Sequence, residues 1–135
     1  MDKDVLYNKI AIIERCLMRI REVYDNNPDN LNDYTKQDSI VLNIQRAIEA
    51  TIDIAMYIVS VKKLGIPQNS RDAFEVINHY NIIDDDLLKK LKAMIGFRNI
   101  AVYNCQKLNL DILKQVIENH LVDFEEFIYA VNKIN

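Results

Sequence analysis

Residues 41–60 read VLNIQRAIEATIDIAMYIVS, and apolar side chains recur in this stretch at intervals of three and four. That spacing is typical of one face of an α-helix. The inward positions are Val41, Ile44, Ile48, Ala55 and Ile58. Thr51 is the one polar residue on the stripe, and its hydroxyl can bond a carbonyl one turn back. We expect this helix to begin near Gln37 or Asp38, to end at about Leu64 and to form the spine of the domain.

Four more helices are predicted from the same kind of periodicity. The first spans residues 3–24, and the third follows an N-cap at Ser70. Three aspartates at residues 84–86 open the fourth helix, where its dipole favours carboxylates, and a metal site is not expected there. Asn109 or Asp111 caps the fifth. The expected buried side of the fifth helix is Ile112, Leu113, Val116, Ile117, Leu121, Phe124, Phe127 and Val131.

Composition favours an all-α protein. The chain has 135 residues, 50% of them hydrophobic, with only two glycines and two prolines, too few for the many tight turns of a β protein. We predict one domain over residues 1–135, folded as an up-and-down bundle of about five helices.

Charge and cysteine content limit the classes of function. A net charge of −3 excludes a broad basic surface, so any contact with RNA must be local. Cys16 and Cys105 make neither a disulfide framework nor a metal site, and no cofactor is expected. No leader or membrane-spanning stretch is apparent. A cytoplasmic protein without a membrane partner is the simplest reading.

An arginine falls on an apolar stripe in residues 94–105, which read MIGFRNIAVYNC. Arg98 continues the spacing of the apolar residues Leu87, Leu91, Met94 and Ile95. A buried guanidinium keeps its charge, so Arg98 must face a carboxylate, a partner subunit or a ligand phosphate. Gly96 costs about 1 kcal/mol in a helix interior, which suggests that another helix approaches closely there.

Two sets of charged residues are best read as solvated faces. The first is a polar strip on the second helix, formed by Arg46, Glu49, Asp53, Tyr57 and Ser60. Asp53 is its exception, and for it we favour a structural ion pair with Arg46 or Arg98 over a catalytic role. The second set could steer a phosphate, although the solvated reading is favoured, and it consists of Lys89, Lys90, Lys92 and Lys107.

Four blocks of the sequence, in order, resemble the HEPN superfamily, and specifically its HepT-like branch of minimal bacterial and archaeal toxins. The blocks are residues 41–49 (VLNIQRAIE), 52–55 (IDIA), 65–74 (GIPQNSRDAF) and 96–99 (GFRN). The resemblance implies a helical homodimer in which two arginine strips face one another across a composite cleft. It also implies metal-independent RNA cleavage and a partner, an MNT-type nucleotidyltransferase antitoxin.

The sequence departs from the family at two positions. The family pattern has a histidine after the arginine, with four to six residues between, and in HepT a tyrosine two beyond; here these positions hold Tyr103 and Cys105. By resemblance the catalytic positions are Arg98, Asn99 and Tyr103, and Cys105 is at the position that the antitoxin modifies. Asp53 and Arg46 are possible supporting residues. The departures indicate either a degenerate copy or a toxin inactivated for expression.

Three functions stay open at this point. The chain is an endoribonuclease toxin, active or disabled at Tyr103, or a non-catalytic module that binds nucleotide, RNA or the nucleotidyltransferase. A helical dimerisation domain without a ligand is the third reading. It explains the predicted core but leaves Arg98 on the apolar stripe unexplained.

Overall fold

The computed structural model describes residues 2–103 and 109–134, with side chains described for residues 2–98 and 109–134. Helices make up the described part, which contains no strand. They are α1 (Lys3–Tyr24), the 3-10 helix η1 (Pro28–Asn32), α2 (Tyr34–Val61), α3 (Ser70–His79), α4 (Asp85–Tyr103), α5 (Leu110–Gln115), the π-helical turn η2 (Val116–His120) and α6 (Leu121–Asn132). Because α5, η2 and α6 follow one another without a break, they act as one long helical segment.

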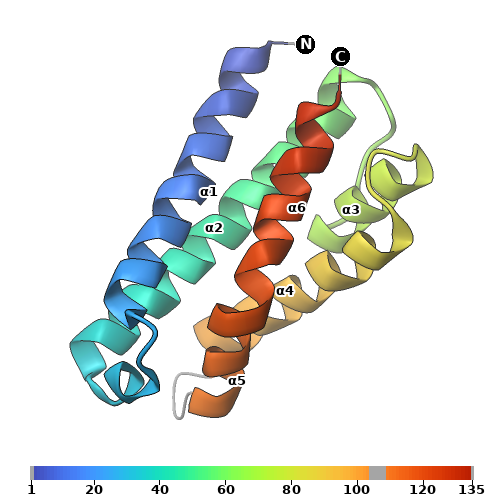
Figure 1. Cartoon of the computed structure of the whole chain (residues 1–135). Coiled ribbons are helices and arrows are strands. Elements are labelled where there is room, and N and C mark those ends of the chain that lie inside the picture. The colour runs from blue at the N-terminus through green and yellow to red at the C-terminus, as the bar shows by residue number, and fades with distance from the viewer. Residues whose placement is uncertain (1, 104–108, 135) are drawn as a thin grey trace.

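The long helices run up and down beside one another. In Figure 1, α1 descends, α2 returns along it, and α6 rises on the other side of α2 towards the end of the bundle at which α1 begins. α4 crosses α2 and α6 at an angle and contacts both, while α3 packs on α2 and α4. The prediction of an all-α bundle is confirmed. None of the described helices has the length and apolarity that a bilayer-crossing segment requires.

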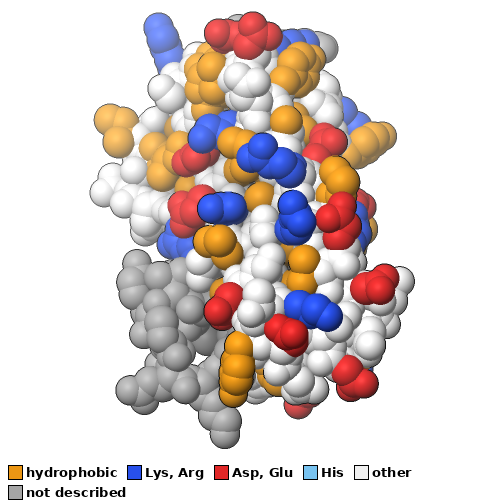
Figure 2. All heavy atoms as spheres, turned by 90° about the vertical axis from the view of Figure 1, so that its left-hand side faces the viewer, with side chains coloured by type: hydrophobic (Ala, Val, Ile, Leu, Met, Phe, Trp, Pro, Cys, Tyr) orange, Lys and Arg blue, Asp and Glu red, His pale blue; other side chains and the backbone are white. Residues whose placement is uncertain are grey.

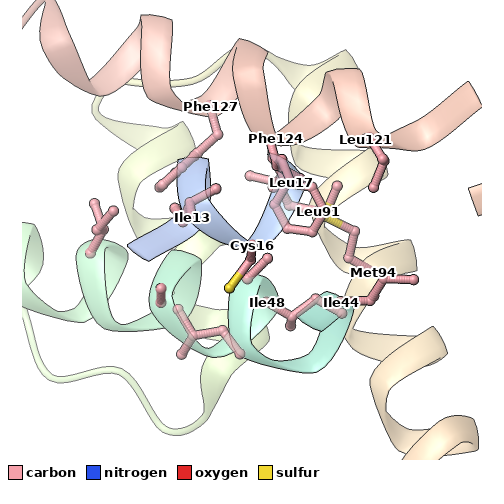
Figure 3. Packing of buried hydrophobic residues seen from close by; sticks show 14 of the residues in the cluster. Ile13, Cys16, Leu17, Ile44, Ile48, Leu91, Met94, Leu121, Phe124 and Phe127 are labelled. Carbon is pink, nitrogen blue, oxygen red and sulfur yellow. The ribbon is translucent and has the colours of Figure 1, made fainter. Parts of the chain in front are cut away.

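The core lies where α1, α2, α4 and α6 meet. Figure 3 shows their apolar side chains converging from all four helices, among them Leu17, Ile48, Leu91 and Phe124. Phe127 is fully buried and its ring meets that of Phe74 edge to face, with 6.1 Å between the ring centroids. This geometry suits aromatic quadrupoles and adds to the stabilisation from apolar burial.

The spine helix α2 starts and stops about three residues earlier than the sequence pattern predicts. It starts early because the Asp33 side chain caps it, accepting a hydrogen bond from the Lys36 backbone N–H at 3.1 Å. The predicted Thr51 bond is confirmed, since its hydroxyl donates to the Ala47 carbonyl at 2.8 Å. Val41, predicted to face inward, is only half-buried.

The N-cap predicted for α3 was wrong by one residue. Ser70 is the first residue of the helix, and the cap is Asn69, whose side chain accepts from the Asp72 backbone N–H at 2.8 Å. Both residue types cap well, so the choice between neighbours depends on backbone geometry that the sequence does not reveal.

The buried stripe predicted for the last helix was wrong at its start. Asn109 caps α5 as expected, but Ile112 is 44% exposed although Leu113 is fully buried. The cause is the π-helical turn η2, which places an extra residue in one turn. If the buried positions of α6 are extended back into α5 with 3.6 residues per turn, the predicted buried face no longer matches the real one.

Tyr24 links the end of α1 to η2, and this link should make stability depend on pH. Its side chain is buried and its hydroxyl donates to the Glu118 carboxylate. Burial first, and then this hydrogen bond, raises the pKa of Tyr24 to about 12. A tyrosine of the unfolded chain has a pKa of about 10. The stabilisation is therefore complete below about pH 10 and is lost as the pH rises towards 12.

The measurement is the free energy of unfolding in urea, from about pH 9 to about pH 12, for the unchanged chain and Tyr24→Phe. The unchanged chain should have the higher free energy of unfolding at about pH 9, and its difference from Tyr24→Phe should shrink as the pH rises to about 12. A difference in the free energy of unfolding that stays constant with pH would contradict the proposed role of the Tyr24 hydrogen bond.

Candidate functional site

Arg98 lies near the end of α4 and pairs with a carboxylate of α2. Its Nη1 atom is 2.8 Å from Oε1 of Glu49. The Arg98 side chain is 21% exposed and that of Glu49 is 55% exposed. Arg98 is less buried than its place on the apolar stripe predicts, and a carboxylate faces the guanidinium, which is one of the three predicted alternatives. An ion pair this exposed contributes little to stability, so a phosphate can compete with Glu49 for Arg98.

The structure separates Asp53 and Arg46 from Arg98. Oδ2 of Asp53 is 2.9 Å from Nζ of Lys9, and the Asp53 side chain is about half exposed. The expected ion pair of Asp53 with Arg46 or Arg98 was therefore wrong, because Lys9 of the neighbouring α1 reaches the carboxylate. Arg46 is exposed.

The outer face of α1 and α2 carries no continuous basic area. Figure 2 shows that on this face the Lys and Arg side chains are interspersed with Asp and Glu. Such a face has weak attraction for a long polyanion, in agreement with the net charge of −3. Any RNA site on this face must depend on a few precisely placed groups.

Two of the α4 lysines pair with carboxylates of this chain. Lys90 lies 3.0 Å from Asp86 and 3.3 Å from Glu126, and hydrogen bonds to these two acids raise its pKa. Lys92 pairs with Glu75 of α3. Lys89 is exposed, and Lys107 lies outside the described residues. Ion pairing of Lys90 and Lys92 leaves them poorly placed to steer a phosphate.

Gly96 is approached by a side chain, so the expected close approach of another helix was wrong. A Cβ atom added at Gly96 would lie 3.7 Å from Nη2 of Arg71, which is ordinary van der Waals contact. Alanine therefore fits at this position. The Arg71 guanidinium comes from α3 and approaches Gly96, which lies two residues before Arg98 along α4.

Gly96→Ala is accordingly expected to raise the free energy of unfolding by about 0.5–1 kcal/mol. Alanine restricts the unfolded chain and has the higher helix propensity. Urea unfolding of the two chains measures the difference. A loss of more than about 1 kcal/mol would show that the space above Gly96 is occupied in solution.

The other predicted catalytic positions are placed only in part. Positions 99 and 103 belong to α4, while the side chains of Asn99 and Tyr103 and all of Cys105 lie outside the described residues. Of the three aspartates at residues 84–86, Asp84 accepts from the Leu87 backbone N–H at 2.8 Å, which confirms the capping role. In the part of the chain that the structure describes, no group of three His, Cys, Asp or Glu side chains could hold a metal ion.

Sequence reasoning missed a cavity of about 500 Å³ beside Arg98. It opens between α2, α4 and the segment from α5 to α6, and Gly96 and Phe97 form part of its wall. On the opposite wall Nδ1 of His120 is 3.0 Å from Oδ2 of Asp123, whose side chain is 3% exposed. The sequence held one signal for this pair, an acid three residues after a histidine, with apolar residues around them.

Comparison with known proteins places the chain in a family. The family described as "Ribonuclease HepT-like" matches residues 13–131. An mRNA nuclease HepT from Shewanella oneidensis is 50% identical over 128 residues, which are 95% of this chain and 96% of that protein.

Solved structures agree with this match. A tri-AMPylated Shewanella oneidensis HEPN toxin in complex with an MNT antitoxin has a TM-score of 0.92 and 47% identity, covering 99% of this chain and all of the toxin chain. A toxin–antitoxin structure with AMP-PNP has a TM-score of 0.92 and 48% identity, over 97% of this chain and 99% of the other. YutE from Bacillus subtilis, 14% identical with a TM-score of 0.83 over 98% of this chain and 89% of its own, shares the fold alone. The family match and the 50% identity together show that this chain belongs to the HepT-like ribonuclease family.

Proposed function

We propose that this chain is the toxin component of a HEPN/MNT toxin–antitoxin pair, acting on RNA in the cytoplasm as one domain of 135 residues. The observation that carries the proposal is Arg98, a partly exposed guanidinium on α4 that pairs with the half-exposed carboxylate of Glu49. Half of the residues are identical to those of an mRNA nuclease, which supports RNA as the substrate class.

Arg98 would stabilise charge during cleavage of RNA without a metal ion. When the 2′-hydroxyl attacks the adjacent phosphate, negative charge builds up on the phosphate oxygens. A fixed guanidinium can then donate two parallel hydrogen bonds to them. Asn99 would contribute a further hydrogen bond. The exposed position of Glu49 allows it to yield to the incoming phosphate.

The proposed site lacks a side chain at position 103 that transfers protons efficiently at neutral pH. A general base should titrate near working pH, as imidazole does, whereas a phenol has a reference pKa of about 10. Tyr103, at the position of the family histidine, can donate a hydrogen bond but is a poor base at neutral pH. The proposed site therefore has a phosphate-binding group in Arg98 and lacks an efficient general base at position 103.

A homodimer would complete the cleft. Two copies of Arg98 facing one another would make a locally positive site in a chain whose net charge is −3. This arrangement explains how an acidic protein can bind a polyanion, because the attraction acts over the short distance at which salt screens least.

The partner is an MNT-type nucleotidyltransferase antitoxin. The related toxin–antitoxin structures support this partner, and one of those toxins is tri-AMPylated. Cys105 lacks the phenolic hydroxyl of the family tyrosine. We therefore expect the antitoxin to bind this chain without transferring nucleotide to position 105, and Cys105→Tyr to supply an acceptor.

A second candidate function is a non-catalytic module that holds RNA, nucleotide or the nucleotidyltransferase. The residues at positions 103 and 105 favour it, because both departures remove chemistry and leave Arg98 in place. The two candidates share the binding site and differ in turnover.

RNA binding tests what the two candidates share. Fluorescence anisotropy of a labelled single-stranded RNA should show that Arg98→Ala weakens binding about tenfold or more, as expected for loss of a charge-assisted contact. Arg19→Ala is the matched control, because it removes the same charge from an exposed ion pair on α1. Equal effects of the two substitutions would contradict an RNA site at Arg98.

A further inference from the structure

We propose that Arg71 of α3 is a second phosphate-binding residue, which binds an RNA phosphate beside the one at Arg98. This inference rests on the proposed function for its ligand class and adds a residue from a different helix. Arg71 is exposed, and its Nη2 atom lies 3.7 Å from the place of a Cβ atom at Gly96. Because Gly96 has no side chain, the Arg71 guanidinium can lie close to the backbone of α4.

The contacts between α3 and α4 follow one face of α4, and Arg71 makes the last of them. α3 packs beside α4 in Figure 1. In order along α4, the polar contacts are Asp85 with Asn78, Lys92 with Glu75, and Gly96 with Arg71. Residue numbers rise along α4 as they fall along α3, so the two helices are antiparallel. The first turn of α3, which contains Arg71, is therefore the turn of α3 that reaches furthest towards the C-terminal end of α4.

The same face of α4 continues to two of the predicted catalytic positions. Positions 96, 99 and 103 are three and four residues apart and belong to one helix, so they share a face. From the rise and radius of an α-helix, the Cα atoms of residues 96 and 98 are about 5.4 Å apart. Arg71 therefore lies where α3 stops covering this face, within one turn of Arg98 along α4. An RNA strand bound at Arg98 can contact both guanidinium groups.

The charge of Arg71 has no partner within the described part of the chain. Its side chain forms no ion pair and no hydrogen bond with any described residue. The next residue, Asp72, uses its carboxylate to accept from the Gln68 backbone N–H at 2.8 Å. Arg98, in contrast, is paired with Glu49. The Arg71 guanidinium can therefore bind a phosphate without first breaking an ion pair with a described residue, and five donors in a planar group suit phosphate oxygens.

The stability of α3 does not explain an arginine at position 71. Asn69 caps this helix, and Arg71 is its second residue. The N-terminal end of a helix carries partial positive charge, which disfavours a cation and favours an anion such as Asp72 in the same turn. Residues that oppose the local preference of their own helix are expected mainly at functional sites. A phosphate bound by Arg71 would offset the unfavourable interaction of its charge with the helix dipole.

The salt dependence of RNA binding tests the proposal. Fluorescence anisotropy of a labelled single-stranded RNA gives the affinity of the purified chain at several salt concentrations. Each phosphate neutralised on a single strand adds about 0.7 to the steepness with which log K falls against log salt concentration. Arg71→Ala should make this slope shallower by about 0.7 and weaken binding about fivefold or more. Arg71→Lys should keep the slope but bind less tightly than arginine, because an ammonium group neutralises the phosphate without the paired hydrogen bonds.

Two controls separate phosphate binding from other effects of the substitution. Arg19→Ala removes the same charge from an exposed position of α1 and should leave the slope unchanged. Urea unfolding should show that Arg71→Ala unfolds at the same urea concentration as the unchanged chain or at a slightly higher one, because the removed cation opposed the helix dipole. An unchanged slope in Arg71→Ala would overturn the proposal. A lower urea midpoint combined with an unchanged slope would assign Arg71 a structural role instead.

The outcome can be separated from that of the proposed function. If Arg98→Ala weakens RNA binding and Arg71→Ala behaves as Arg19→Ala does, the second phosphate site fails and the proposed function stands. If Arg71→Ala makes the slope shallower and Arg98→Ala does not, the site at Arg71 stands and the assignment of RNA to Arg98 fails. Absence of RNA binding by the unchanged chain would contradict both.

Discussion

Tyr103→His and Cys105→Tyr, made together, are expected to raise RNA cleavage by about 10²–10⁴-fold, the usual contribution of general acid–base catalysis. The structure holds Arg98 on α4 against Glu49, so the group that would stabilise charge in the proposed mechanism is present before the substitutions. Position 103 lies within the same helix, and an imidazole there titrates near neutral pH. The measurement is the single-turnover cleavage rate of a labelled RNA with a chelator present.

The single substitutions identify which residue restores cleavage. Tyr103→His alone should give nearly the full gain, because the histidine moves the protons. Cys105→Tyr alone should leave the rate unchanged and restore an acceptor for nucleotide transfer by the antitoxin. A gain in cleavage from Cys105→Tyr alone would contradict this division of roles.

Phe127→Ala is expected to lower the free energy of unfolding by about 3–5 kcal/mol. Phe127 is fully buried, and its ring contacts Phe74 edge to face, so the substitution leaves a cavity between α6 and α3 and removes an aromatic pair. Urea unfolding monitored by circular dichroism measures the change. Val122→Ala, 47% exposed on the same helix, is the control and should change stability by less than about 0.5 kcal/mol. A small effect of Phe127→Ala would contradict the packing described for the core.

The sequence predicted the helices well because apolar periodicity reports the buried face directly. α1 has the predicted bounds. Errors arose where local backbone geometry decides which of two neighbouring residues caps a helix, as at Asn69 and Ser70. They also arose where η2 changes the helical period. A π-helical turn has no reliable signature in the sequence, so the exposure of Ile112 was not predictable from a stripe.

The sequence predicted that Arg98 faces a carboxylate, a partner subunit or a phosphate, and it missed the cavity near this residue. Arg98 stood out because a charge on an apolar stripe requires a partner, and the structure supplies Glu49. The choice of partner was not predictable, because Glu49 and Asp53 lie one turn apart on the same polar strip. Only the packing of α1 and α4 against α2 determines that Glu49 pairs with Arg98 and that Asp53 pairs with Lys9. The cavity was missed because its walls come from distant segments whose apolar residues each read as ordinary core.

We propose that Arg98 forms the RNA-cleaving site of this scaffold. The most direct test compares RNA cleavage, with a chelator present, by the chain carrying Tyr103→His and Cys105→Tyr and by the same chain with Arg98→Ala added. Loss of one preorganised charge-stabilising group should lower the rate by about 10²–10³-fold, and Arg19→Ala in its place should leave the rate unchanged. Equal cleavage by the chains with and without Arg98 would contradict the claim.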